Sequence, residues 1–504
     1  MSLAVVYTRA EDGVQAPLVT VEVHLSGGLP GLAIVGLPEA EVRESRDRVR
    51  AALINSAFEV PQQKMTVNLA PADLPKEGGR FDLPIAIGVL AASRQLPAEA
   101  VSRYEFIAEL ALSGELRSVR GALPAVLRAL EQGRIPIVPR GNAIEAGLVA
   151  NGAALSATSL LEVAAHLRGR HSLPSCPPPN ASVGEAANSL DLADVRGQLA
   201  ARRALEVAAA GAHNLLMVGP PGSGKTMLAS RLPGVLPPLA DDEALEVAAI
   251  SSITGAGVDP VAWRQRPFRA PHHTASSVAL AGGGGHPRPG EVSLAHHGVL
   301  FLDELTEWNR SVLEVLREPM ESGRIIISRA ARQSEFPARF QLVAAMNPCP
   351  CGYYGDPSGR CHCSPDQVAR YRSRVSGPLL DRIDIHIEVA RQPTTALSNH
   401  APPGEASESV RARVQTARLR QLKRAGKPNA LLGTRELTRD CELQSNDQRL
   451  LERAIDKLNL SARAYHRILR LARTIADLAG AESLATAHLT EAIAYRRGER
   501  VVGR

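Results

Sequence analysis

The sequence predicts an α/β protein with a parallel-sheet core, a helical domain after it and a second α/β domain before it. Short apolar runs such as "NLLMVG", "GVLFLDE" and "FQLVAAMN" alternate with helix-like stretches in the middle of the chain. This alternation is typical of parallel strands joined by crossover helices. The first segment also mixes apolar runs with helical stretches, and the last segment shows helical periodicity with few strand signals.

Length and composition indicate a globular protein of several domains. A chain of 504 residues is long enough for about three domains, and 44% hydrophobic with 22% charged residues is ordinary for soluble proteins. The stretch "MSLAVVYTRAEDG" lacks the pattern of a signal peptide, and no apolar run is long enough to span a membrane. We therefore expect a cytoplasmic protein without a membrane partner, in which clustered cysteines indicate metal rather than disulfides.

Two stretches rich in Pro, Ser and Asn have the character of linkers. They are residues 168–190 and 391–408, and neither shows an apolar period. They divide the chain into expected domains at residues 1–167, 191–390 and 409–504.

The basic residues are concentrated towards the C-terminal end. Residues 391–504 contain 21 Lys and Arg against 12 Asp and Glu, whereas the preceding segments are slightly acidic. Attraction for a polyanion should therefore be sought there. The stretch "RARVQTARLRQLKRAGK" at 411–427 holds seven basic residues and no acid. Phosphate binding and a solvated or subunit-contacting helix face explain it equally well, and the absence of aromatic residues argues against base stacking.

A phosphate-binding loop follows the first strand of the middle segment. The sequence "GPPGSGKT" matches G-x-x-x-x-G-K-[ST] between the strand "NLLMV" and a helix, and comprises Gly219, Pro220, Pro221, Gly222, Ser223, Gly224, Lys225 and Thr226. Backbone N–H groups of such a loop close around phosphate oxygens at a helix N-terminus. We expect Lys225 to reach the β- and γ-phosphates of ATP and Thr226 to bind Mg²⁺.

Two further strands end in polar residues suited to ATP hydrolysis. In "GVLFLDE", Asp303 is expected to hold Mg²⁺ through water, and Glu304 to act as the general base for the attacking water. Asn347 ends the strand "VAAMN" and could orient that water, although a polar strand end is the alternative.

Four of the six cysteines lie within fifteen residues. Cys349, Cys351, Cys361 and Cys363 form C-x-C-x9-C-x-C around the turn-rich stretch "GYYGDPSG". Four thiolates brought together in this way suit tetrahedral Zn²⁺, and His362 is a possible substitute ligand. Free thiols at a loop tip and an iron–sulfur cluster remain as alternatives. We call residues 349–363 the cysteine knuckle.

The motifs together resemble those of a known family. "GPPGSGKT", "FLDE", "MNP" and "LLDR" resemble AAA+ ATPases of the helix-2-insert group, which includes the magnesium-chelatase ATPase subunit and MCM helicases. The stretches "FRAPHHTAS", "NPCPCGYYGD" and "RILRLARTIADL" narrow the resemblance to the magnesium-chelatase-like YifB/ComM family, over essentially the whole chain.

This resemblance implies a hexameric ATP-driven motor with a helical lid. It implies action on single-stranded, forked or branched DNA, as a helicase or in branch migration during recombination or natural transformation. A protein-remodelling or metal-chelatase type of motor is the alternative. Arg382 in "LLDR" would be an arginine finger for a neighbouring subunit. In "SAR" at 461–463, Arg463 would be the second sensor, in preference to Arg467.

A cluster of histidines falls in the region that corresponds to the helix-2 insert. Five of them lie between the phosphate-binding loop and "FLDE": His272, His273, His286, His296 and His297. The intervening "AGGGGHPRPG" favours a pore-facing substrate loop over a metal site.

The first segment resembles the proteolytic domain of Lon, which has a ribosomal S5 domain 2-like fold. Asp82 stands at the position of Lon's serine, in "PKEGGRFDLPIA", and Pro124 at the position of its lysine. A Ser–Lys dyad needs both a nucleophile and a base. The resemblance therefore implies a peptidase-like scaffold without peptidase activity.

Overall fold

The computed structural model describes residues 3–150, 152–178, 190–255, 257–285, 287–329, 332–392, 403–458 and 460–497. The chain divides into two units, one formed by residues 1–184 with 241–264 and the other by residues 185–240 with 265–504. No helix in these described ranges is both long and apolar enough to cross a bilayer.

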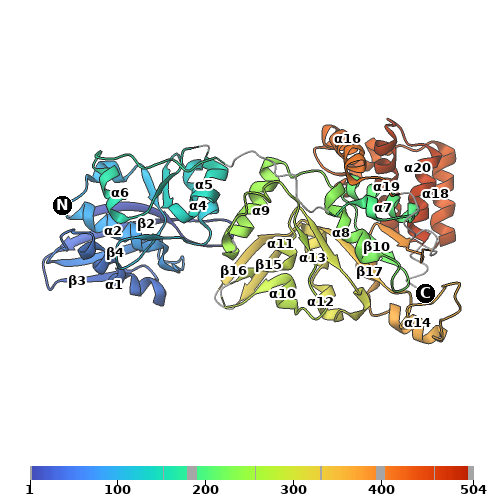
Figure 1. Cartoon of the computed structure of the whole chain (residues 1–504), viewed down its shortest axis with the longest axis horizontal. Coiled ribbons are helices and arrows are strands. Elements are labelled where there is room, and N and C mark those ends of the chain that lie inside the picture. The colour runs from blue at the N-terminus through green and yellow to red at the C-terminus, as the bar shows by residue number, and fades with distance from the viewer. Residues whose placement is uncertain are drawn as a thin grey trace. The chain divides into compact units, whose positions relative to one another are not determined.

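A seven-stranded mixed sheet forms the centre of the first unit (Figure 1). Its order is β3-β4-β2-β1-β5-β8-β9, with β1 Leu3–Arg9, β2 Leu18–Ser26, β3 Gly31–Val35, β4 Lys64–Ala70, β5 Tyr104–Phe106, β8 Ile135–Pro139 and β9 Leu155–Ala157. The pairs β1–β2 and β2–β4 are antiparallel and the others are parallel. Buried residues alternate along β1, β2 and β4, as expected where one face of a sheet is covered. A small hairpin pairs β6 Glu109–Leu110 with β7 Leu116–Arg117.

The helix α2, Asp82–Ala92, is buried along its whole length. Its sequence "DLPIAIGVLAA" is apolar on all sides, and it packs on β1 and β2. At its first residue, Asp82 Oδ2 accepts a hydrogen bond from Arg48 Nε at 2.8 Å and another from the Leu110 amide at 3.2 Å. Burial raises the pKa of Asp82, and the Arg48 hydrogen bond opposes this shift. The residue expected at the position of Lon's serine is thus a carboxylate paired with Arg48.

The other helices of the first unit include one from a distant part of the sequence. They are α1 Ala40–Asn55, α3 Ala98–Val101, α4 Ala122–Glu131, α5 Ala143–Ala150, α6 Leu160–Leu167 and α9 Asp241–Thr254. Helix α9 lies inside the range 191–390 expected for the ATPase domain, yet it packs on α4 and α5 of the first unit. Its Ser252 accepts hydrogen bonds from the backbone of Gly121 and Leu123, at 3.0 and 3.3 Å.

A five-stranded parallel sheet forms the core of the second unit, which confirms the predicted parallel α/β pattern. The order is β11-β14-β17-β10-β18, with β10 Leu215–Val218, β11 Phe268–Arg269, β14 Val299–Leu302, β17 Gln341–Met346 and β18 Ile385–Glu388. The three apolar runs named above are β10, β14 and β17. They are buried throughout, as strands covered on both faces should be. Because all five strands run the same way, the residues after them meet at one edge of the sheet.

Helices and two hairpins complete the second unit around this sheet (Figure 1). The helices up to residue 392 are α7 Leu199–Gly211, α8 Lys225–Val235, α10 Ser277–Ala281, α11 Glu291–Leu294, α12 Arg310–Glu314, α13 Arg317–Ser322, α14 Pro365–Arg372 and α15 Gly377–Leu380. The hairpins pair β12 Gly282–Gly283 with β13 Arg288–Pro289, and β15 Arg324–Arg329 with β16 Arg332–Pro337.

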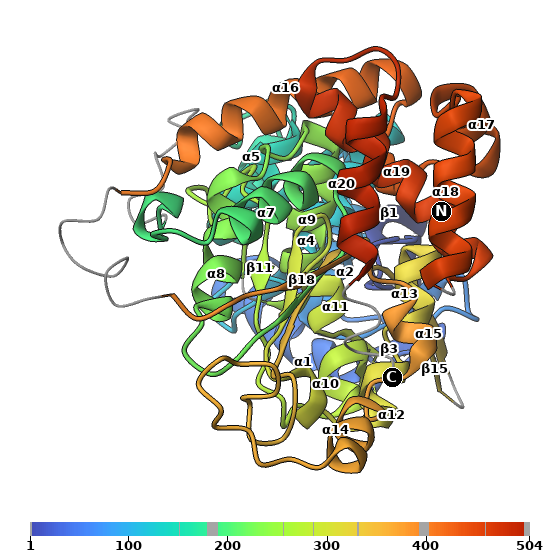
Figure 2. The same cartoon turned by 90° about the vertical axis from the view of Figure 1, so that its right-hand side faces the viewer.

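The C-terminal helices gather in one cluster, drawn in orange and red (Figure 2). They are α16 Ser407–Ala425, α17 Thr434–Asp440, α18 Ser445–Leu458, α19 Ala462–Ala479 and α20 Thr486–Arg497. Helix α16 packs on α7 and α8, and α19 packs on α7, α16 and α20. The cluster is therefore seated directly on the helices that flank the phosphate-binding loop.

Candidate functional site

The loop "GPPGSGKT" connects β10 to α8 and owes its shape to its glycines. Gly222 and Gly224 have φ of +73° and +91°, values that L side chains rarely adopt. A Cβ on Gly219 would lie 2.2 Å from the carbonyl oxygen of Val389. Glycine at this position therefore lets the end of β10 approach the chain that leaves β18.

Lys225 is the first residue of α8 and is largely buried. Its Nζ donates to the carbonyl oxygens of Gly219 and Pro220, at 2.7 and 3.1 Å, and to Asn347 Oδ1 at 3.2 Å. Burial lowers the pKa of Lys225, and Asp303 and Glu304 oppose the shift. A phosphate oxygen is a stronger acceptor for this ammonium group than the carbonyls it now contacts.

Asp303 lies opposite the next residue of α8. Thr226 Oγ1 donates a hydrogen bond to Asp303 Oδ2 at 2.6 Å. The two oxygen atoms that could bind a metal ion therefore lie next to each other at the edge of the sheet. The other carboxylate oxygen accepts from the Glu304 amide at 2.8 Å, and Trp308 Nε1 donates to the Asp303 carbonyl at 3.0 Å. A hydroxyl and a carboxylate so placed are a ligand set that Mg²⁺ prefers.

Glu304 is exposed and has an unusual backbone. Its φ of +49° and ψ of +48° place a non-glycine residue in the left-handed region, a form of strain that is concentrated at functional sites. Its Oε2 lies 3.3 Å from Nδ1 of His273. His273 follows β11, which pairs in parallel with β14, so the histidine and Glu304 both lie at the carboxyl ends of adjacent strands.

Four of the five histidines between the phosphate-binding loop and "FLDE" form two neighbouring pairs. The ring centroids of His272 and His273 are 4.2 Å apart, and those of His296 and His297 are 4.0 Å apart. His296 is buried, and its Nδ1 accepts a hydrogen bond from the amide of Arg339 at 2.9 Å. His286 lies outside the described residues. The contact of His273 with Glu304 was not predicted from the sequence.

The structure brings Lys225, Thr226, Asp303, Glu304 and Asn347 to one edge of the sheet, as the strand-end positions predict. It does not bring Arg382 there. Arg382 is 8% exposed, and its guanidinium forms an ion pair with Glu321 and donates to the Pro378 carbonyl at 2.6 Å.

The two arginines considered for the second sensor differ in their contacts. Arg463 lies in the first turn of α19, which is capped by Ser461 Oγ, and it is exposed. Within the described part of the chain it makes no hydrogen bond or ion pair. Arg467 instead donates to Asp384 Oδ1 at 2.6 Å. Arg463 therefore has no partner for its guanidinium among the described residues, and its role as the second sensor stays a prediction.

The four cysteines of the knuckle converge. The Sγ atom of Cys349 lies 3.2 Å from that of Cys351 and 3.8 Å from that of Cys361, and the last two are 3.6 Å apart. All four Sγ atoms, including that of Cys363, lie within 4.8 Å of one another. Thiolates at about 2.3 Å from a tetrahedral zinc ion are about 3.8 Å apart. The four residues therefore fit a metal ion.

Five of the seven basic residues of 411–427 bind acceptors within the chain, although only Arg418 among them is buried. Arg418 donates to the carbonyls of Ala209 and Ala210, and Arg424 donates to Asp477. Three others bind within the chain in the same way: Arg411 to the Gly234 carbonyl, Arg413 to Glu206 and Glu405, and Lys427 to Glu436.

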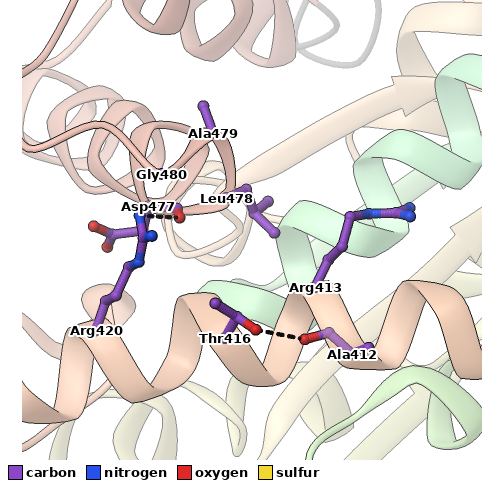
Figure 3. A pocket seen from close by; sticks show the side chains of 8 residues that line it. All are labelled: Ala412, Arg413, Thr416, Arg420, Asp477, Leu478, Ala479 and Gly480. Carbon is purple, nitrogen blue, oxygen red and sulfur yellow. Dashed lines mark hydrogen bonds between the residues drawn. The ribbon is translucent and has the colours of Figure 1, made fainter.

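Only Arg420 and Lys423 of this stretch are left exposed with little or no partner. Arg420 lines a small pocket where α16 passes the end of α19, with Thr416 and Asp477 (Figure 3). Its single hydrogen bond among the residues that the structure describes, to the Asp477 carbonyl, is long at 3.4 Å. Lys423 makes no hydrogen bond or ion pair to any described residue.

Comparison with known proteins matches this chain along nearly its full length. The family model "Magnesium chelatase, subunit ChlI" matches residues 191–397, "Subunit ChlI of Mg-chelatase" residues 21–142, and "Magnesium chelatase, subunit ChlI C-terminal" residues 404–496. Competence protein ComM of Haemophilus influenzae is 55% identical over 100% of this chain and 99% of its own. The uncharacterized protein YifB of Escherichia coli is 53% identical, over 100% and 98%, and Rv2897c of Mycobacterium tuberculosis is 43% identical, over 99% of each chain.

Proposed function

The chain belongs to the magnesium-chelatase-like family of ComM and YifB, and from this premise we propose that it is an ATP-driven motor that remodels DNA. The observation that carries the ATPase part is the convergence of Lys225, Thr226, Asp303, Glu304 and Asn347 at one sheet edge. The DNA part is supported by the basic excess of residues 391–504 and by the name of the ComM relative, a competence protein. Strand separation or branch migration, in recombination or natural transformation, is the form of remodelling we propose.

The residues of the site divide the work of hydrolysis among them. Lys225 turns from its carbonyl partners to the phosphates, and Thr226 and Asp303 would hold Mg²⁺, which neutralises phosphate charge. Glu304 takes the proton of the attacking water, and Asn347 orients that water. In a hexameric ring, Arg382 would exchange Glu321 for a neighbour's γ-phosphate, and Arg463 would contact the phosphates from the lid.

We further propose that the cysteine knuckle holds a structural zinc ion. Two of the three Sγ separations, 3.6 and 3.8 Å, are those of a tetrahedral thiolate site, whereas the third, between Cys349 and Cys351, is shorter at 3.2 Å; Cys349 is fully buried. Metal analysis of protein purified under reducing conditions should find about one zinc per chain, and absence of both zinc and iron would refute this.

A protein-remodelling or chelatase-type motor is the second candidate, because the matching family models are those of magnesium chelatase. An ATP-dependent peptidase is not supported. Asp82 is ion-paired with Arg48, and Pro124, which is buried in α4, carries no base.

The deciding experiment is ATP hydrolysis measured at low salt with no DNA and with single-stranded, duplex and forked DNA. Forked or branched DNA should stimulate hydrolysis, and ATP should drive strand exchange on a joint molecule. Glu304→Gln should bind the same DNA without driving strand exchange, which separates DNA binding from ATP-driven remodelling. If DNA neither binds nor stimulates the assembled protein, the protein-remodelling function replaces this one.

A further inference from the structure

The cysteine knuckle touches the phosphate-binding loop directly. Gly352 has φ of +85°, and a Cβ on it would lie 2.6 Å from Cδ and 2.8 Å from Cγ of Pro221. The same Cβ would lie 3.9 Å from Cγ of Asn347. The backbone of the knuckle therefore rests against the proline ring in the middle of the loop, with no space for a side chain between them.

A second connection runs through the polypeptide itself. Cys349 comes two residues after Asn347, and the Asn347 amide oxygen accepts the hydrogen bond of Lys225. The Gly352 amide donates to the Cys349 carbonyl at 2.9 Å, which closes a tight turn between the first thiol and the contact with Pro221. The position of Cys349 thus affects two sides of the nucleotide site.

Few interactions other than the thiol cluster hold the knuckle in place. Residues 349–363 are described throughout and contain no helix or strand, and eight of the fifteen are exposed. Arg372 of α14 supports the base of the knuckle, donating to the Pro348 carbonyl at 3.1 Å and lying 5.1 Å from the centre of the Tyr354 ring. A segment with so little buried apolar surface has low local stability unless a metal ion joins its ends.

We propose that metal in the knuckle controls the affinity of the nucleotide site, because the loaded knuckle presses Gly352 against Pro221 and holds the phosphate-binding loop in its binding form. This proposal rests on the proposed zinc site and assigns that site an effect on nucleotide binding. The ion is a divalent cation that prefers four thiolates. Loss of the ion removes the support that Gly352 gives to Pro221, which we call the brace. The phosphate-binding loop then samples conformations that bind phosphate poorly.

The first test separates the contact from the metal. Gly352→Ala adds a methyl group against Pro221, whereas Gly355→Ala is a matched control, because Gly355 has φ of +79° in the same knuckle and nothing within 4 Å of its Cβ position. Both glycines have similar positive φ, so alanine strains the backbone at either position, and neither variant changes a thiol. Gly352→Ala should retain its zinc and bind ATP more weakly. If the loop stays competent in about a tenth of molecules, Kd rises about tenfold.

The second test removes the metal. The Kd of ATP is measured in excess Mg²⁺ by titration calorimetry for wild type, for Cys361→Ser, and for wild type stripped of zinc and then reloaded. Stripping and Cys361→Ser should each raise Kd by about the factor seen for Gly352→Ala, and reloading wild type with zinc should restore it. Circular dichroism at each step checks that the fold persists.

The outcomes distinguish this inference from the zinc proposal on which it rests. Purified protein without zinc or iron refutes both. Zinc that can be removed and returned with no change in the Kd of ATP refutes the brace alone. Equal affinities for Gly352→Ala and Gly355→Ala also refute the brace, whereas a selective loss in Gly352→Ala with retained zinc supports it.

Discussion

Removal of the two exposed cations of α16, in Arg420→Ala/Lys423→Ala, should weaken DNA binding in a salt-dependent manner. Each Lys or Arg that neutralises a phosphate releases a counterion, which contributes about 0.9 to the slope of log K against log salt on duplex DNA and about 0.7 on single strands. Two lost contacts should therefore flatten the slope by about 1.8 on duplex or about 1.4 on single-stranded DNA, for each subunit in contact.

The structure sets this magnitude by excluding the neighbouring arginines. Arg418 is 8% exposed and satisfies two backbone carbonyls, and Arg424 is paired with Asp477. If all four cations contacted phosphate, the slope on duplex DNA would fall by about 3.6. Arg418→Ala should instead reduce stability, by about 2–4 kcal/mol, because the carbonyls of Ala209 and Ala210 lose their donor.

The assay is fluorescence anisotropy of labelled DNA across a range of salt concentrations. A suitable control is Arg43→Ala/Arg50→Ala, which removes two exposed arginines from α1 of the first unit and changes net charge equally. The control should leave the slope unchanged. An unaltered slope in Arg420→Ala/Lys423→Ala, or an equal loss in the control, would show that α16 does not contact phosphate.

Three further predictions concern hydrolysis. Glu304→Gln should lower kcat by about 10²–10⁴ while the Kd of ATP with Mg²⁺ is retained, because the metal ligands remain; turnover at the wild-type rate would refute its role as base. His273→Ala should lower kcat by about 10–100-fold with an unchanged Kd of ATP, because the side chain that positions Glu304 is lost. The control is His272→Ala, since His272 is an exposed neighbour that is hydrogen-bonded to Thr274. This variant should resemble wild type in the same steady-state assay. Arg382→Ala and Lys225→Ala should each abolish hydrolysis, and mixing the two proteins should restore part of it if Arg382 acts on a neighbouring subunit.

The nucleotide site could be predicted because each of its parts is a short continuous motif next to a buried strand. In a parallel sheet the ends of such strands meet at one edge, so Lys225, Asp303 and Asn347 follow from their sequence positions alone. The contact between His273 and Glu304 could not be found in this way. It depends on β11, a strand of only two residues, whose pairing with β14 has no recognisable pattern in the sequence.

The internal contacts of Arg418 had a detectable signal in the sequence. Val410, Val414 and Arg418 are spaced by four residues and lie on the buried face of α16. A count of charges ignores this period, whereas helical geometry places Arg418 with the two valines. Helix α9 gave no comparable signal, because no linker-like composition separates it from the chain on either side.

The segment after α15 connects the proposed arginine finger, Arg382, to the C-terminal helices. Arg382 is followed by Ile383, whose carbonyl accepts a hydrogen bond from Arg496 of α20, and by Asp384, which pairs with Arg467 of α19. Burial opposes ionisation of Asp384, but Arg467 and His213 hold its pKa far below the usual range, so this ion pair persists at neutral pH. If the chain is the proposed ATP-driven motor, we expect C-terminal helices that move with the nucleotide state to pull on residues 383 and 384. In a ring, that pull would reposition Arg382 at the neighbouring active site, and hydrolysis in one subunit would be communicated to the next.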